Sequence, residues 1–143
     1  MIKLNPYLNF AGNTEEAFNF YKSVFGGEFA TVMRFGDVES LEGTERGTTE
    51  ANRIMHIALP IGEEMLMGTD TSDAEDENLE PGNNFTLSIS PDTEKEADEL
   101  FSKLSAGGST EVEMRKEFWG DYFGMCTDKF GIRWMINVRA EEK

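Results

Sequence analysis

Two stretches of the sequence decide the fold: NTEEAFNFYKSVFGG at residues 13–27 and TEKEADELFSKLSAGG at residues 93–108. Each begins with a polar residue that is followed three positions later by Glu, which is the pattern of a helix capping box. Apolar residues then recur at i, i+3, i+4 and i+7 before a Gly-Gly pair. The four apolar positions match after a shift of 80 residues, with Ala17, Phe20, Tyr21 and Val24 in the first stretch and Ala97, Leu100, Phe101 and Leu104 in the second. The pattern predicts two equivalent amphipathic helices.

The segments around these helices repeat as well. Because the helical period alone makes a four-residue match common, the flanking pattern is needed to decide between duplication and chance. One strand-like run precedes each helix and three follow it, all rich in β-branched, aromatic or Met residues. The predicted strands are residues 2–10, 28–35, 53–60 and 64–69 in the first half and residues 85–90, 109–116, 119–127 and 132–139 in the second. This order predicts an α+β fold of tandem βαβββ modules.

Length fits one domain built from these two modules. The chain has 143 residues, and a domain of this size buries enough surface to fold without a disulfide or a structural metal. We predict a single domain over residues 1–143. It divides into a first module at 1–70, an acidic linker at 71–82 and a second module at 83–143.

Two polar stretches interrupt the modules. Residues 70–80 contain six acidic side chains and are followed by Pro81 and Gly82, and residues 36–52 contain five acidic side chains. Their carboxylates lack the spacing of a calcium-binding loop. Both stretches are therefore predicted to be solvated loops.

The charge and the cysteine content restrict partners and location. The chain has 28 acidic and 13 basic side chains, a formal net charge of −15, and no basic patch. Such a charge repels phosphate backbones and anionic lipid, so we expect binding to neither nucleic acid nor membranes. The single Cys126 cannot form an internal disulfide, and the N-terminal residues lack a signal-peptide pattern. These features favour a cytoplasmic location.

Both ends of the chain resemble a known family. NPYLNFAGNTEEAFNFYKSVFGGE at residues 5–28 and FWGDYFGMCTDKFGIRWMINV at residues 118–138 look like the PhnB-like branch of the vicinal oxygen chelate superfamily, also labelled 3-demethylubiquinone-9 3-methyltransferase. The superfamily includes glyoxalase I, extradiol dioxygenases and bleomycin-resistance proteins. The resemblance implies an incomplete eight-stranded barrel around a cavity, with one helix outside each half, and a homodimer.

The resemblance also implies a divalent metal, held by His, Glu or Gln on the inward faces of four strands. At the corresponding positions this sequence has Asn5 or Pro6, the Met-Leu-Met of residues 65–67, Asn84 or Phe85, and Met135. None of these is a usual ligand for such an ion, and thioethers suit soft copper instead. We therefore predict no metal site and no cofactor. The methyltransferase label also lacks support, because no strand leads into a glycine-rich turn that opens a helix.

His56 is the only histidine and the candidate for acid–base catalysis. Strict alternation along residues 53–60 places it with Ile54 and Ala58 on the face toward the expected cavity. An imidazole there would act as a general base or donate a hydrogen bond to a ligand. The alternative is a half-buried polar residue satisfied by a neighbour. Cys126 lies in an apolar strand without a cationic neighbour, so core packing is predicted for it.

The candidate ligand site consists of polar and aromatic side chains on the strand faces that are expected to line the cavity. Arg133 shares a face with Met135 and could bind a carboxylate or phosphate, the alternative being an ion pair at the rim. Aromatic residues there could line a pocket, fill the core or bury a dimer interface. The predicted ligand-binding residues are Asn5, Tyr7, Asn9, His56, Trp119, Phe123, Arg133, Met135 and Asn137.

Two classes of function remain open from the sequence. The first, which we favour, is a protein that binds an aromatic or amphipathic small molecule without the usual metal. The second is a lyase, isomerase or dioxygenase whose metal or base lies at non-standard positions such as His56, Glu63 or Glu64.

Overall fold

The computed structural model describes residues 1–38 and 49–140, which form two compact units, one within residues 1–80 and one within residues 81–143. The described elements of the first unit are β1 (Tyr7–Phe10), α1 (Thr14–Phe25), β2 (Thr31–Arg34), η1 (Phe35–Asp37), α2 (Thr49–Asn52), β3 (Ile54–Ile61), β4 (Glu64–Asp70) and η2 (Asp73–Asn78). Those of the second are β5 (Leu87–Ile89), α3 (Glu94–Ser105), β6 (Ser109–Lys116), β7 (Tyr122–Thr127) and β8 (Arg133–Val138).

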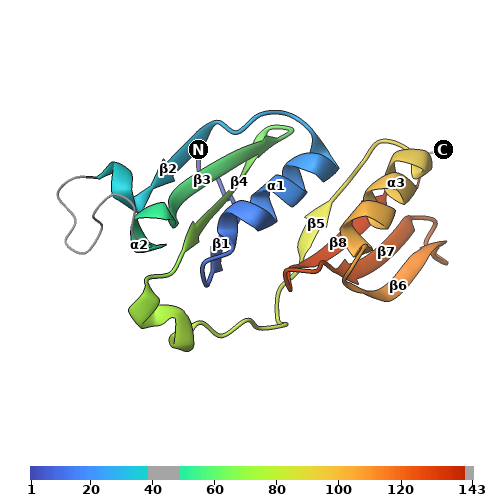
Figure 1. Ribbon diagram of the computed structural model, residues 1–143. Helices are drawn as coiled ribbons and strands as arrows, with labels where there is room; N and C mark the ends of the chain where they lie inside the picture. The colour runs from blue at the N-terminus through green and yellow to red at the C-terminus, as the bar shows by residue number, and fades with distance from the viewer. Residues whose placement is uncertain (39–48, 141–143) are drawn as a thin grey trace. The chain divides into compact units, whose positions relative to one another are not determined.

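Each unit has the same topology (Figure 1). The described strands form one four-stranded sheet of order β1-β4-β3-β2 and another of order β5-β8-β7-β6. β1 runs parallel to β4 and β5 parallel to β8, whereas the other pairs are antiparallel. The predicted α+β fold of two βαβββ modules is confirmed. The sheets are open, with no closed barrel among the described strands.

One long helix packs on each sheet. α1 contacts β3 and β4, and α3 contacts β6, β7 and β8. The core of each unit lies between its helix and its sheet. Its buried side chains include Leu8, Phe18 and Leu66 in the first unit and Leu104 and Ile136 in the second. No helix in the described part of the chain is long and apolar enough to span a membrane.

The N-terminus of α1 is capped by a strand and not by its own capping box. The side chain of Asn13 makes no capping hydrogen bond, so this half of the sequence prediction is wrong. The backbone N–H groups of Gly12 and Thr14 donate instead to Oδ1 of Asp70, at 3.1 and 3.0 Å. A carboxylate at a helix N-terminus is also favoured by the helix dipole. In α3 the Thr93 side chain does accept from the Glu96 N–H, at 3.1 Å, as predicted.

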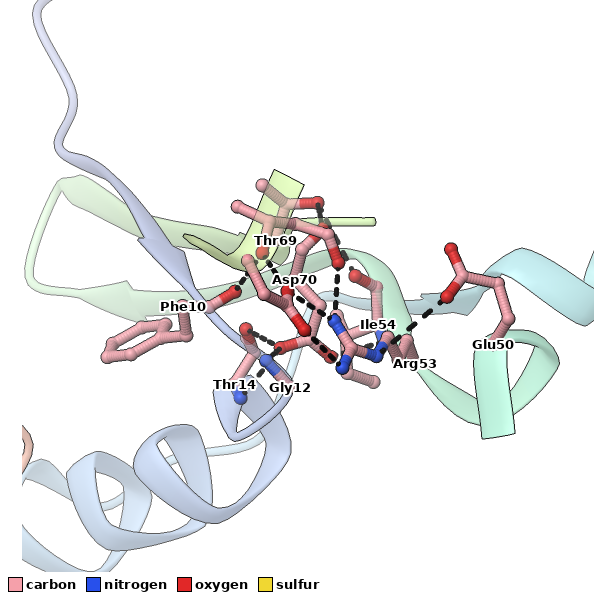
Figure 2. Close-up of polar contacts among 10 residues, drawn as sticks. Phe10, Gly12, Thr14, Glu50, Arg53, Ile54, Thr69 and Asp70 are labelled. Atoms are coloured by element: carbon pink, nitrogen blue, oxygen red, sulfur yellow. Dashed lines mark hydrogen bonds and ion pairs between the residues drawn. The ribbon is translucent and has the colours of Figure 1, made fainter. Parts of the chain in front are cut away.

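The Asp70 carboxylate joins three elements (Figure 2). It is 4% exposed and also accepts from the Thr14 hydroxyl, at 2.6 Å, and from the Ile54 N–H, at 2.8 Å. It therefore holds the β1–α1 turn and the start of β3 against the end of β4. The sequence prediction placed Asp70 in a solvated acidic stretch, and this is wrong because its carboxylate satisfies buried backbone donors.

Arg53 holds two residues of the acidic stretch, Thr71 and Asp76, next to the beginning of β3. Its Nη1 donates to the Thr71 carbonyl and its two Nη atoms bind both oxygens of Asp76, all within 2.7–2.8 Å. Gly12, with φ +99°, lies under this guanidinium, and a Cβ there would come within 3.0 Å of Arg53 Nη2. These contacts order η2, where a loop was predicted.

Other departures from prediction have local causes. β1 begins at Tyr7, and not at residue 2, beyond a proline that has no N–H for a sheet ladder. A register shift between Met33 and Arg34 pairs them with His56 and Ile54 and leaves Met55 as the extra residue. The described ends of the stretch 36–52 form parts of η1 and α2 where a loop was predicted, and residues 39–48 lie outside the described residues.

The first prediction concerns Asp70. We expect Asp70→Asn to lower the free energy of unfolding by about 2–3 kcal/mol, because an amide nitrogen would leave a buried N–H donor without an acceptor. Glu77→Gln, in the same acidic stretch but exposed, should change it by less than about 0.5 kcal/mol. Urea unfolding followed by circular dichroism measures both. Equal small effects would show that Asp70 does not hold the three elements together.

The second prediction concerns acid stability. Hydrogen bonds from Arg53, and then from Thr71, lower the pKa of Asp76 from 3.8 to about 2. A lowered folded-state pKa stabilises the protein above the unfolded value, and this contribution is lost as the pH falls from about 4 to about 2. Asp76→Asn should therefore be less stable than the unaltered protein above pH 4, and the two unfolding free energies should converge near pH 2. Parallel curves across this range would contradict the assignment.

Candidate functional site

The side of the first sheet that faces away from α1 carries the candidate residues of the first unit. Tyr7 pairs with Met67, Met67 with Ala58, and Met33 with His56, and paired residues lie on the same side of a sheet. Leu8 and Phe10 are buried on the other side, because successive side chains of a strand point to opposite faces. We call this side the first open face; its members are Tyr7, Asn9, Thr31, Met33, His56, Ala58, Pro60, Met65, Met67 and Thr69.

Tyr7 and His56 contact each other on this face. Their rings are stacked, with centroids 5.7 Å apart and an interplanar angle of 28°. The Tyr7 hydroxyl lies 3.4 Å from Nδ1 of His56, which is at the long end of the hydrogen-bond range. Because one ring nitrogen faces the phenol, Nε2 is the nitrogen available to a ligand. The contact joins residues 49 positions apart, so no local pattern could have revealed it.

The two asparagines of the first strand segment have different roles. Asn5 Oδ1 accepts from the Met65 N–H at 3.0 Å, so its side chain extends the ladder between β1 and β4. Asn9 is exposed on the first open face. Asn5 thus uses its amide oxygen within the sheet, whereas Asn9 presents its amide to the surroundings.

The second sheet has a corresponding side, facing away from α3. Met135 pairs with Met125 on one neighbour and Ser88 on the other, and Asn137 pairs with Phe123. Trp119 lies in the turn before β7, and its ring is 6.4 Å from that of Phe123. We call this side the second open face; its members are Ser88, Ser109, Val112, Arg115, Phe123, Met125, Thr127, Arg133, Met135 and Asn137.

Asp121 orients two of these residues and was not identified from the sequence. It accepts from the backbone N–H of Ala140 at 2.8 Å and from the Asn137 amide at 3.0 Å, and the Trp119 side chain also donates to it. These donors, the Ala140 N–H foremost, lower the pKa of Asp121. The carboxylate therefore sets the directions of Trp119 and Asn137. One acid among 28 carries no distinguishing sequence signal.

The side chains of Arg133 and Cys126 have different surroundings: Arg133 binds a backbone carbonyl, and Cys126 is buried in the core. The Arg133 guanidinium donates to the backbone carbonyl of Asn83, next to the beginning of the second sheet. Cys126 is 1% exposed, and burial, followed by the charges of Glu111 and Asp128, raises the pKa of its thiol to about 12. The prediction that Cys126 packs in the core is confirmed.

Comparison with known proteins gives the family. The sequence model of the glyoxalase/bleomycin resistance protein/dioxygenase superfamily matches residues 3–136. The chain belongs to this superfamily. It is 32% identical over 142 residues to protein YjdN of Escherichia coli K12, covering 97% of each chain. The predicted family is therefore confirmed.

Solved structures show the same fold. The crystal structure of PA1353 from Pseudomonas aeruginosa superposes with a TM-score of 0.84 at 33% identity, covering 99% of this chain and 100% of that one. The PhnB protein of Bacillus cereus, which carries a provisional 3-demethylubiquinone-9 3-methyltransferase assignment, gives a TM-score of 0.70 at 24% identity, covering 96% and 100%. The predicted resemblance to PhnB-like proteins is thus found in the fold.

The residues present do not fit the divalent metal of the wider superfamily. Among the described residues no three His, Cys, Asp or Glu side chains are grouped closely enough to hold a metal ion. The first open face provides one imidazole, a phenol, two hydroxyls, an amide and three thioethers, and the second provides thioether, amide, hydroxyl and guanidinium groups. Hard and borderline ions prefer carboxylate and imidazole ligands. We derive no reaction step through such a metal.

Proposed function

We propose that this PhnB-like protein binds an aromatic or amphipathic small molecule on its open sheet faces, without the usual divalent metal. The observation that carries the proposal is the composition of these faces. Five of the eight methionines, namely Met33, Met65, Met67, Met125 and Met135, belong to the two open faces. Unbranched thioether side chains adapt to ligands of irregular shape and are common on binding surfaces.

Ring systems accompany the methionines on both faces. The first open face presents the stacked pair Tyr7 and His56, and the second presents Phe123 with Trp119 beside it. Small-molecule sites are mostly apolar and aromatic, with a few placed polar groups that orient the ligand. Here Nε2 of His56 and the oriented Asn137 amide supply such groups. The side chains therefore favour a planar, largely apolar ligand with one or two hydrogen-bonding substituents.

A catalytic alternative rests on the Tyr7–His56 contact. A phenol 3.4 Å from an imidazole resembles an acid–base pair that could move a proton to or from a bound ligand. In that case the protein would be a lyase, isomerase or dioxygenase-type enzyme whose base lies outside the usual positions. Binding alone is favoured because no carboxylate or second imidazole of the first open face supports the pair.

The third prediction tests ligand binding. With ε-¹³C-methyl-methionine labelling of the full chain, planar aromatic fragments should shift the methyl signals of Met67 or Met135. The signal of Met114 should stay fixed, because its sulfur lies next to Gly124 on the helix-covered side of the second sheet. For a fragment that shifts Met135, Met135→Ser should weaken binding about tenfold, the loss expected for one buried apolar side chain.

The same experiment has a control and an outcome for the catalytic alternative. Val32→Ser removes an exposed apolar side chain on the α1 side of the first sheet and should leave fragment affinity unchanged. Recovery of the fragment unaltered supports binding alone, and its conversion in a His56-dependent manner supports the enzyme. If no fragment moves an open-face methyl signal at millimolar concentration, the proposed function is wrong.

A homodimer in the cytoplasm is also part of the proposal. The turn between β6 and β7 presents Phe118, 96% exposed, and Trp119, 51% exposed, with their rings edge to face at 4.9 Å. Exposed adjoining aromatics of this kind are typical of interfaces. We infer that this turn packs against a second copy of the chain.

The fourth prediction tests the dimer. The unaltered protein should have twice its chain mass of 16.1 kDa by light scattering after gel filtration. Phe118→Ala with Trp119→Ala should give the monomer mass, whereas Phe85→Ala, at another exposed aromatic residue, should not. A mass that is unchanged in the double variant would rule out this turn as the interface.

A further inference from the structure

We propose that the first open face holds a soft monovalent metal ion, Cu(I), through Nε2 of His56 and the sulfur atoms of Met33 and Met67. The inference goes beyond the proposed small-molecule function and does not depend on it. It rests on the placement of one imidazole between two thioethers on one side of a sheet.

Strand pairing brings the three side chains together. Met33 lies directly opposite His56 in the β2–β3 ladder, and such pairs have Cβ atoms about 4.5–5.5 Å apart. Met67 lies opposite Ala58, two residues beyond His56, so it is the diagonal neighbour of the imidazole on the other flank. Diagonal neighbours are about 7–8 Å apart, within reach of long side chains. The two thioethers can therefore approach the imidazole from opposite sides.

Tyr7 prepares the imidazole for this role. Metal-binding histidines usually donate their second ring N–H to an oxygen acceptor, which fixes the tautomer and the ring direction. With Nδ1 protonated, His56 would donate to the Tyr7 hydroxyl oxygen 3.4 Å away, and the stacked phenol would hold the ring. The lone pair of Nε2 then remains for the metal. Tyr7 is thus a positioning residue and not a ligand.

The chemistry of the face selects the ion. Thioether and imidazole ligands suit Cu(I), whereas zinc, manganese and magnesium prefer sites with thiolates or carboxylates. None of the side chains of the first open face carries a fixed charge, as its members listed above show. A singly charged ion suits such a face better than a divalent ion, and the net charge of −15 attracts cations generally.

The fifth prediction is a Cu(I) titration of the full chain under anaerobic conditions, with bicinchoninate as the competing chelator and none of the fragments of the third prediction present. We expect one tightly bound Cu(I) per chain. Removal of an outer-shell partner of a metal-binding histidine typically lowers metal affinity about 10–100-fold, so Tyr7→Phe should weaken Cu(I) binding about tenfold. Removal of a ligand, in Met33→Leu, Met67→Leu or His56→Ala, should weaken it at least as much. Leucine keeps the size of methionine and removes only the sulfur.

Controls separate this site from other sulfur atoms. Met125→Leu and Met135→Leu, on the second open face, should leave Cu(I) affinity unchanged, as should Cys126→Ala, whose thiol is 1% exposed. As a second measurement, Ag(I) should shift the ¹³C-methyl signals of Met33 and Met67 and not those of Met125 and Met135. Lack of Cu(I) binding, loss of binding in Cys126→Ala, or unchanged affinity in both Met33→Leu and Met67→Leu would each overturn the proposal. Because the titration contains none of those fragments, its failure leaves the fragment-binding result to be judged separately.

Discussion

The buried carboxylate of Asp70 is the contact on which the first unit depends. Its two oxygens accept four hydrogen bonds from the β1–α1 turn and the start of β3. An isolated buried charge is costly, and here the hydrogen bonds of backbone and hydroxyl donors compensate that cost. The cluster fixes where β1 ends and where β3 begins, and those two strands present Tyr7 and His56. The candidate site therefore inherits its geometry from a residue that never faces it.

The two units fill the space between helix and sheet in different ways. In the first, the ring of Phe18 on α1 occupies the space above Gly68 of β4, where a Cβ would lie 2.6 Å from that ring. In the second, the large side chain comes from the strand: Trp134 of β8 is buried, and its indole N–H donates to Asp128 at 2.9 Å. Duplicated topology thus persists although the bulky residue has moved from helix to sheet.

Local pattern was sufficient for the two long helices, for the order of helices and strands along each module, and for the burial of Cys126. The helical stripe and the two-residue alternation report directly on which side of an element is covered. The capping role of Asp70 was hidden because a charged residue in an acidic stretch looks solvated until the strand that places it is known. Likewise, the bulge at Met55 and the partnership of Tyr7 with His56 depend on cross-strand register, which a single sequence does not specify.

The proposed function depends on the donor atoms of the open faces: the chain belongs to the superfamily, but among the described residues no three His, Cys, Asp or Glu side chains are grouped closely enough to hold a metal ion. The most direct measurement is elemental analysis of untagged protein from cells supplied with zinc, nickel, manganese and iron. The prediction is far less than one equivalent of each of these ions per chain after dialysis. One equivalent of any of them, lost in His56→Ala, would contradict it and would restore a metal-dependent reaction of the superfamily type.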